Sequence, residues 1–356
     1  MKEVTLRDVA KEAGVSLATV SFALRNSPKI SQVKRDHIQQ VAASMGYRQN
    51  PLVSASMARI RGTRAVNYQA TLGWVNDSPD ADAWKSSKMY LGAQARAEEL
   101  GFVLDDLFLP EIRMDEPEVN VRRFCQIAQA RGIHGVLLPE PYRWQHAREP
   151  WPDMAVVVIG HITCHAHHTT LSRQARQSPY NSVVAGIFTN LWAIYDALHE
   201  RGYQRIGLTG TDWLNQFWDN QLRAAGLEFN EILPAASRVA PFMLEYRGKK
   251  VPDSFRTWIK DQRPDVVIAC IFEVGGWLEQ LGLKAPEDIG LANINLGPLE
   301  QGWSGLDQRN ELIGAAAVDL LSSHMIRNDR GVPLYPKRVT IPGIWVDGET
   351  TRPMKD

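Results

Sequence analysis

Residues 4–31, VTLRDVAKEAGVSLATVSFALRNSPKIS, constrain the fold of this chain more than any other stretch, because their pattern is that of two short helices and a tight turn. Apolar residues recur at three- and four-residue spacing over Leu6–Ala13, which predicts one buried helical face. Gly14 suits the positive φ angle of a turn between helices. Ser16 is the expected N-cap of a second helix, Leu17–Leu24. The stretch therefore predicts a helix-turn-helix.

The flanking residues complete a small helical unit. Thr5 is the expected N-cap of the first helix, and Ser31 is the expected N-cap of a third helix that stops at Gly46. In the second helix, Val20 and Leu24 are expected to face inward. The apolar stripe expected on the third helix consists of Val33, Ile38, Val41, Ala42 and Met45.

Charge is distributed unevenly along the chain. The whole chain has 40 basic and 40 acidic residues, but residues 1–64 contain 11 Lys or Arg and four Asp or Glu, a net charge of +7. The remaining residues therefore carry −7. A basic head on a mildly acidic body indicates that one end of the molecule faces phosphates.

Three features bear on the compartment. The cysteines Cys125, Cys164 and Cys270 are odd in number and far apart, which argues against a disulfide framework and for a reducing compartment. Met1 leads into a polar helix rather than a signal peptide. No apolar run approaches the roughly 18 to 20 residues that span a bilayer. We expect a soluble cytoplasmic protein with no membrane partner.

Short motifs are spread through the first 47 residues: Val4-Thr5-Leu6, Asp8-Val9-Ala10, Ala13-Gly14-Val15-Ser16, Thr19-Val20-Ser21, Ile30-Ser31 and Gly46-Tyr47. Together they closely resemble the N-terminal signature of the LacI/GalR family of bacterial transcription regulators. The resemblance implies that the second helix enters the major groove of double-stranded DNA. It implies as DNA contacts the residues Thr5, Leu6, Ser16, Leu17, Ala18, Thr19, Ser21, Phe22, Arg25, Lys29, Ser31, Tyr47, Asn50, Ser56, Met57 and Arg59.

The residues of the second helix divide by chemistry. Hydroxyl groups at its start and along it are suited to phosphate oxygens, whereas Leu17, Ala18 and Phe22 stand where base edges are reached. The family often has polar or long side chains at the first two of these positions and arginine at the third. Apolar groups here favour thymine methyls or DNA shape over guanine. The alternative for Phe22 is packing inside the head.

Residues 46–64 form the next unit. Asn50 is a plausible N-cap with Pro51 at the first helical position, but the helix that follows is too short to be stable alone. By resemblance it is the hinge helix, which enters the minor groove as a pair and wedges an apolar side chain into a base step. The usual leucine of that wedge aligns with Ser56. We hypothesise that the neighbouring Met57, or a shifted register, supplies the wedge; the alternative is an ordinary linker.

From about residue 66 short apolar runs alternate with helical patterns, which predicts a doubly wound parallel sheet. The expected strands are 71–75, 103–108, 135–138, 156–159, 205–208, 266–269, 289–294 and 337–341. The expected helices are 88–100, 119–130, 183–201, 217–225, 275–281 and 310–328.

The fold class expected is therefore α/β. An all-α helix-turn-helix head and hinge helix precede a core that, by resemblance, is a two-lobed periplasmic-binding-protein type I core. Three crossovers are expected near 160–180, 295–304 and 329–337. The expected boundaries are a head at 1–48, a hinge and linker at 49–64, an N-terminal lobe at 65–160 plus 304–330, and a C-terminal lobe at 161–303 plus 331–349.

In such sheets a ligand lies off the carboxyl ends of the strands, here between the lobes. Aromatic residues nearby, among them Trp213 and Phe217, could stack on sugar faces or serve as core. The candidate effector-binding residues are Asn76, Asp77, Trp84, His161, Trp218, Asp219, Asn295 and Asp307.

Three departures from the family pattern concern this cleft. Gly186-Ile187 stands where the family commonly has Asp-Asn, residues 215–219 lack the arginine that often clamps the effector, and Asn295 replaces a usual aspartate. The effector is therefore expected to be a carbohydrate or a less polar small molecule. The alternative is a degenerate cleft whose regulator responds to a protein partner or to no ligand.

Other chemistry finds little support. His161, Cys164, His165, His167 and His168 could coordinate zinc, but they fall in a presumed crossover without the usual ligand spacing, and a solvated loop is expected instead. No catalytic motif stands out, so neither an enzyme nor a cofactor is expected. We expect a homodimeric repressor that binds a pseudo-palindromic operator.

The wedge hypothesis predicts an effect on DNA shape. Met57→Gly should reduce the bend that the protein imposes on its operator, because no apolar side chain would then unstack the central step. The bend angle can be measured by the mobility of circularly permuted DNA fragments. An unchanged angle would contradict the hypothesis.

Overall fold

The computed structural model describes residues 6–24, 30–45, 70–76, 84–108, 117–139, 151, 154–160, 179–244, 248–297 and 300–354. The chain divides into two compact units, Met1–Asn67 and Tyr68–Asp356, here called the head and the core. Each is described by itself.

The head contains three helices, α1 (Leu6–Glu12), α2 (Leu17–Leu24) and α3 (Gln32–Ser44). Val9, Val20 and Ile38, one from each helix, are fully buried and form its centre. The turn between α1 and α2 has Gly14 at a φ of +61°, and the Ser16 hydroxyl accepts a hydrogen bond from the Thr19 amide at 3.2 Å. The predicted helix-turn-helix, its glycine turn and its serine cap are confirmed.

One residue of the predicted stripe is placed wrongly. Val33 is 80% exposed, whereas Ile38 is fully buried. The two lie five positions apart, and at 3.6 residues per turn this puts them about 140° apart around α3. Val33 therefore belongs to the solvent face of the helix.

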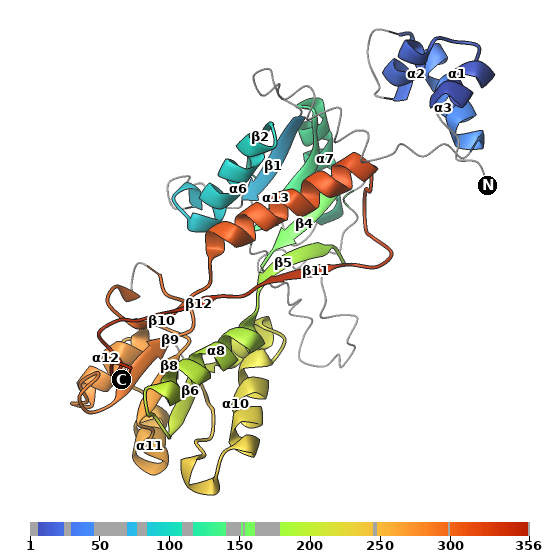
Figure 1. The fold of residues 1–356 in the computed structure, drawn as a ribbon. Coiled ribbons are helices and arrows are strands. Elements are labelled where there is room, and N and C mark those ends of the chain that lie inside the picture. Colours follow the sequence, from blue (N-terminus) through green and yellow to red (C-terminus); the bar gives the residue numbers. More distant parts are fainter. Residues whose placement is uncertain are drawn as a thin grey trace. The chain divides into compact units, whose positions relative to one another are not determined.

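The core contains two six-stranded sheets (Figure 1). The first sheet is entirely parallel and defines lobe one. Its order is β11 (Arg338–Ile341), β5 (Asn181–Ala185), β4 (Ala155–Ile159), β3 (Ile133–Pro139), β1 (Ala70–Asn76) and β2 (Phe102–Phe108). Its helices are α6 (Lys88–Glu99), α7 (Pro117–Ala130) and α13 (Asn310–Arg327).

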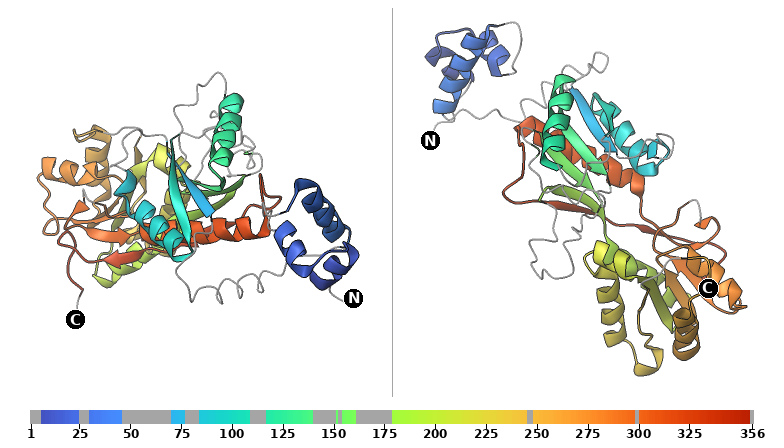
Figure 2. Two further views of the ribbon diagram at one scale, coloured as in Figure 1. Left: turned by 90° about the horizontal axis from the view of Figure 1, so that it is seen from above. Right: turned by 180° about the vertical axis from the view of Figure 1, so that it is seen from behind.

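Both faces of the first sheet are covered. Along β4, Ala155, Val157 and Ile159 pack into one apolar cluster with α6 and α13. The alternate residues Val156 and Val158 pack into a second cluster that includes residues of α7. Figure 2, seen from behind, shows α7 on the side of the sheet opposite α13. This alternation is the arrangement expected of a doubly wound sheet.

The second sheet defines lobe two. Its order is β12 (Ile344–Val346), β10 (Ser304–Asp307), β9 (Gly290–Asn293), β8 (Val266–Ala269), β6 (Ile206–Thr211) and β7 (Phe242–Leu244), with β12 antiparallel to its neighbour. Its helices are α8 (Ile187–Glu200), α9 (Asp212–Phe217), α10 (Gln221–Ile232), η2 (Ala235–Ser237), α11 (Asp253–Gln262) and α12 (Glu273–Gln280).

The chain crosses between the lobes at Gly186, at residues 308–309 and at residues 342–343. The first and third crossovers lie side by side, since the Gly186 amide donates to the Ile341 carbonyl at 3.1 Å. The Gly343 amide donates to the Asn190 side chain at 2.9 Å. These positions differ from the crossovers expected near 160–180, 295–304 and 329–337.

The differences have a common cause. Residues 181–185 form strand β5 in the first sheet, although they were assigned to lobe two and partly to a helix. β11 also lies in the first sheet and β10 in the second, opposite to the expected boundaries. A short run that is buried on both faces lacks the alternation that marks a strand, so its sheet cannot be read from its pattern.

A second correction concerns the helix expected at 217–225. The structure has two helices there, because α9 ends at Phe217 and α10 begins at Gln221. Asp219 and Asn220, between them, have φ angles of 55° and 63°. Left-handed residues cannot continue a right-handed helix, so the pair ends α9. Helix α11 and strands β7, β10 and β12 were not predicted.

Helices α6 and α13 approach so closely that their backbones touch. A Cβ on Gly314 would lie 2.0 Å from the Met89 carbonyl oxygen, and one on Gly92 would lie 2.0 Å from the Glu311 carbonyl oxygen. Only glycine leaves room for this contact. The pair therefore fixes how α13, from the end of the chain, sits on lobe one.

This contact predicts the effect of adding one methyl group. Gly314→Ala should lower the free energy of unfolding by about 1 to 3 kcal/mol or more, because backbone atoms cannot move aside. Urea titration of the full chain, followed by far-UV circular dichroism, measures it. Gly276→Ala in α12 is the matched control, since nothing lies within 4 Å of its Cβ position. It should leave stability unchanged or raise it by up to about 1 kcal/mol. Equal losses from both variants would contradict the prediction.

Candidate functional site

The head presents the start of α2 to solvent. Leu17 is 46% exposed, and Ser16 before it is exposed. The Ser16 hydroxyl lies 2.8 Å from the Thr19 hydroxyl and also caps the helix. Two hydroxyl groups and an apolar side chain therefore stand together at the first turn. Hydroxyls of this kind suit phosphate oxygens, and an exposed leucine suits a base methyl.

The interior of the head fixes that turn. Val20 and Ala23 of α2 are fully buried, and the Gln39 side chain of α3 donates to the Ala23 carbonyl at 2.9 Å. Phe22 is half-buried, which is compatible both with base contact and with packing inside the head. The exposed side of α2 is therefore held by contacts on its other side.

The remaining predicted DNA contacts divide into two groups. Leu6 lies in α1, Ala18 and Ser21 lie in α2, and Ser31 is exposed just before α3. Outside the described residues are Thr5, Arg25, Lys29, Tyr47, Asn50, Ser56, Met57 and Arg59.

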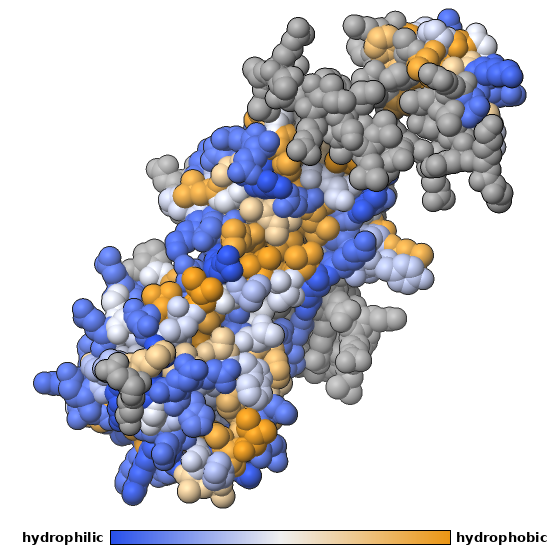
Figure 3. Space-filling view, in the orientation of Figure 1, coloured by the Kyte–Doolittle hydropathy of each residue, from blue (hydrophilic) through white to orange (hydrophobic). Residues whose placement is uncertain are grey.

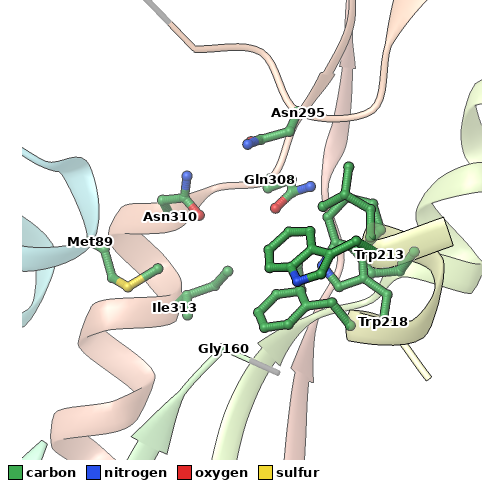
Figure 4. A pocket seen from close by; sticks show the side chains of 12 residues that line it. Met89, Gly160, Trp213, Trp218, Asn295, Gln308, Asn310 and Ile313 are labelled. Carbon is green, nitrogen blue, oxygen red and sulfur yellow. The ribbon is translucent and has the colours of Figure 1, made fainter. Parts of the chain in front are cut away.

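The core contains a cavity of about 200 Å³ where the two lobes meet (Figure 4). Gly160 follows β4, Ala185 ends β5, and Asn295 comes just after β9. The cavity therefore lies off the carboxyl ends of strands from both sheets. This is where ligands bind in open parallel sheets.

Apolar side chains form most of the cavity wall. Lobe one contributes Met89 of α6 and Ile313 of α13, and lobe two contributes Ile187 at the start of α8. The other apolar side chains that line it are Ala185, Trp213, Leu214, Phe217 and Trp218.

Helix α9 supplies the aromatic part of the wall. The rings of Trp213 and Phe217, one helical turn apart, are stacked with centroids 5.2 Å apart and planes 5° apart. The Thr211 hydroxyl caps this short helix by accepting from the Leu214 amide at 3.0 Å. Trp213 is 40% exposed.

Three side-chain amides provide the polar part of the lining. They are those of Asn295, Gln308 and Asn310. The Gln308 amide nitrogen donates to the Ile294 carbonyl at 3.1 Å, which fixes its orientation. Figure 4 shows the three amides along one side of the cavity, with the tryptophans on another and Met89 and Ile313 across from them.

Two predicted acidic residues are not in the lining but in ion pairs between the lobes. Asp219 of lobe two lies 2.9 Å from Arg338 of lobe one. Asp307 at the end of β10 lies 3.3 Å from Lys88 at the start of α6. Each acid is next in sequence to a lining residue, but its charge is already paired.

Trp84 belongs to a second aromatic group on lobe one. Its ring meets Tyr90 edge to face at 5.0 Å, and Trp74 meets the same ring at 5.1 Å. The Tyr90 hydroxyl donates to Asp106 at 3.3 Å. Burial, together with the Asp106 carboxylate, raises the pKa of Tyr90 to about 12, so it stays a donor at neutral pH. Trp84 does not line the cavity.

The other predictions for the cleft have mixed outcomes. Trp218 and Asn295 line the cavity, whereas Asn76 is buried at the end of β1 and does not. Asp77, His161 and the proposed zinc cluster at 161–168 lie outside the described residues. Within the described ranges, no group of three His, Cys, Asp or Glu residues could hold a metal ion.

Sequence reasoning missed Gln308 and Asn310 because strand β10, which positions them, was not predicted. Met89 and Ile313 were missed because apolar residues at helical spacing do not distinguish a buried helix face from a cavity wall. A usable signal did exist at Ile187 and Asn295, where the chain departs from the family pattern and where the structure has cavity-lining side chains.

Comparison with known proteins matches both units. Residues 5–50 match the model of bacterial regulatory proteins of the lacI family, and residues 195–351 match that of a periplasmic binding protein-like domain. The HTH-type transcriptional regulator GalS of Salmonella typhimurium is 43% identical over 63 residues, 18% of this chain and 18% of GalS. The HTH-type transcriptional repressor CytR of Escherichia coli K12 is 46% identical over 48 residues, 14% of each. The chain therefore aligns with less than a fifth of either relative.

Solved structures match along the whole chain. A transcriptional regulator CelR–cellobiose complex has a TM-score of 0.53 at 17% identity and covers 98% of this chain and 100% of its own. The lac repressor dimer bound to operator and the anti-inducer ONPF has a TM-score of 0.53 at 18% identity, with coverages of 98% and 99%. At this identity the likeness shows the fold. No helix in the described ranges is long and apolar enough to cross a membrane.

Proposed function

Because the chain belongs to the LacI family of bacterial regulatory proteins, we propose that it is a sequence-specific transcription regulator, a repressor, that binds a pseudo-palindromic operator as a homodimer. A small molecule in the inter-lobe cavity modulates it. Since its partner is DNA, it acts in the cytoplasm.

The first turn of α2 is the observation that carries this proposal. It presents the exposed Ser16 and Leu17 together with the half-buried Thr19, in a helix-turn-helix whose interior is closely packed. The head is also the basic part of the chain, with a net charge of +7 over residues 1–64. Charge of this sign attracts DNA at long range, and the side chains of α2 supply the short-range contacts.

The cavity supports an effector rather than an empty cleft. Within the described residues, the side-chain amides of Asn295 and Asn310 make no hydrogen bond, and both line the cavity. Polar groups that converge on an apolar pocket are typical of a ligand site. A ligand that binds the closed and open arrangements of the lobes with different affinities would shift the chain toward the arrangement it prefers. The ratio of the two affinities sets the largest change in DNA affinity that the ligand can cause.

Exposed apolar side chains support the homodimer. Figure 3 shows hydrophobic residues gathered over α13 and, lower in the view, over α10. Exposed side chains of these helices include Ile326 of α13, and Leu227 and Ile232 of α10, at 61%, 54% and 59% exposure. Apolar patches on a protein surface commonly mark an interface, and a two-fold axis would bring a second copy onto them.

The DNA-binding proposal predicts strong salt dependence and a role for Leu17. Affinity for a duplex selected from a random pool should fall roughly a thousandfold between about 50 and 200 mM salt, since several phosphates would be neutralised. Leu17→Glu should weaken binding at least about tenfold, because a carboxylate would face the groove. Fluorescence anisotropy with labelled DNA measures both.

The matched control is Gln40→Glu, which adds the same charge at an exposed position of α3. It should weaken binding much less than Leu17→Glu. A salt-independent interaction, or no enrichment of any two-half-site sequence, would count against the proposal.

The dimer proposal predicts that the double variant Leu227→Asp, Ile232→Asp sediments as a monomer at concentrations where the wild-type chain is a dimer, because two carboxylates would be buried without partners. Val332→Asp, at a position 48% exposed outside α10 and α13, should remain dimeric. A dimer in all three proteins would show that α10 is not at the interface.

A further inference from the structure

The described lining of the inter-lobe cavity is uncharged. In the part of the chain that the structure describes, none of its lining residues has an ionisable side chain. Its polar side chains are three neutral amides. Placing an ionised ligand there would take the charge out of water without a counter-charge, which is strongly unfavourable.

Two charged residues that are next in sequence to lining residues are already in ion pairs. Asp219, beside Trp218, is paired with Arg338 at 2.9 Å. Lys88, beside Met89, is paired with Asp307 at 3.3 Å. An ionic ligand would have to compete with an existing partner for either of these two acids or their basic partners.

The two walls of the cavity suit a flat apolar face. The stacked rings of Trp213 and Phe217 lie in nearly parallel planes on lobe two, and Met89 and Ile313 approach from lobe one. A ring held between them would contact an aromatic face on one side and flexible aliphatic groups on the other. Such contacts favour offset stacking of a planar ring.

The hydrogen-bonding side chains of the described lining lie along one edge of the cavity. The amides of Asn295, Gln308 and Asn310 lie along the same side of the cavity (Figure 4). A ligand with hydroxyl groups all around its ring would leave those against the aromatic wall without partners, and an unpaired buried hydroxyl is costly. A ligand with polar groups along one edge would not.

We infer that the effector is an uncharged ring compound with an apolar half and hydrogen-bonding groups along one edge, such as an aromatic alcohol or an aryl glycoside. Sugar acids, sugar phosphates and nucleotides are disfavoured, as are free hexoses. The inference rests on the proposed function, in which this cavity is the effector site.

Three probes test this class in the full-length protein. Benzyl alcohol and benzoate share a ring and differ in charge, and D-glucose is neutral with hydroxyl groups all around its ring. Ligand-detected NMR titration gives their dissociation constants. Benzyl alcohol should bind at least about tenfold more tightly than benzoate or glucose, a difference of about 1.4 kcal/mol.

Variants locate the binding. Trp213→Ala should weaken benzyl alcohol binding at least about tenfold, because it removes a ring that lines the cavity. Phe272→Ala is the control, since Phe272 is 46% exposed on lobe two and does not line the cavity. Met89→Lys would place a cation in the cavity and should raise benzoate affinity at least about tenfold above wild type. Unfolding of this variant would lower benzoate affinity, so a gain in affinity cannot come from unfolding.

The inference is overturned if benzoate or glucose binds more tightly than benzyl alcohol, if benzyl alcohol does not bind, or if Trp213→Ala leaves its binding unchanged. DNA binding is measured on the same samples. Failed ligand selectivity with salt-dependent DNA binding intact would overturn this inference alone. Loss of DNA binding by the wild-type chain would instead contradict the proposed function.

Discussion

The backbone contact between α6 and α13 is the interaction on which the architecture of the core depends. Gly92 and Gly314 let the two helices touch, so a helix from the last fifth of the chain completes lobe one. The preceding strand, β10, belongs to lobe two, so the chain must cross at residues 308–309. That crossing delivers Gln308 and Asn310 to the cavity. The polar part of the candidate effector site thus follows from a packing constraint between helices.

The two lobes are joined by more than their crossovers. The pairs Lys88–Asp307 and Arg338–Asp219 connect lobe one to lobe two beside the cavity. Their side chains are partly exposed, so each pair stabilises the chain by about 1 kcal/mol or less. Weak connections of this kind fit a cleft whose closure a ligand must be able to change.

Local pattern predicted the head and most elements of the core. Gly14 and Ser16 act within a few residues of the turn, and Val9, Val20 and Ile38 each belong to the apolar spacing of one helix, so these features can be read from the sequence. Strand β5 was missed because its apolar residues run directly into those of α8, and a short apolar run cannot be told from the start of a helix by periodicity alone. Because this strand was missed, the expected position of the first crossover was wrong, and so were the expected lobe boundaries.

The sequence by itself determined that this chain has a helix-turn-helix head on an α/β core, because helix periodicity, capping and turn chemistry are local. Tertiary structure alone decided which side chains meet in the cleft. Asp219 and Asp307 stand at strand or helix ends as expected, yet Arg338 and Lys88 from the other lobe engage them. The stack of Trp213 on Phe217 is local to α9, but it meets the amides of Gln308 and Asn310 only through contacts between distant segments. Such contacts depend on how the lobes pack, which no local pattern records.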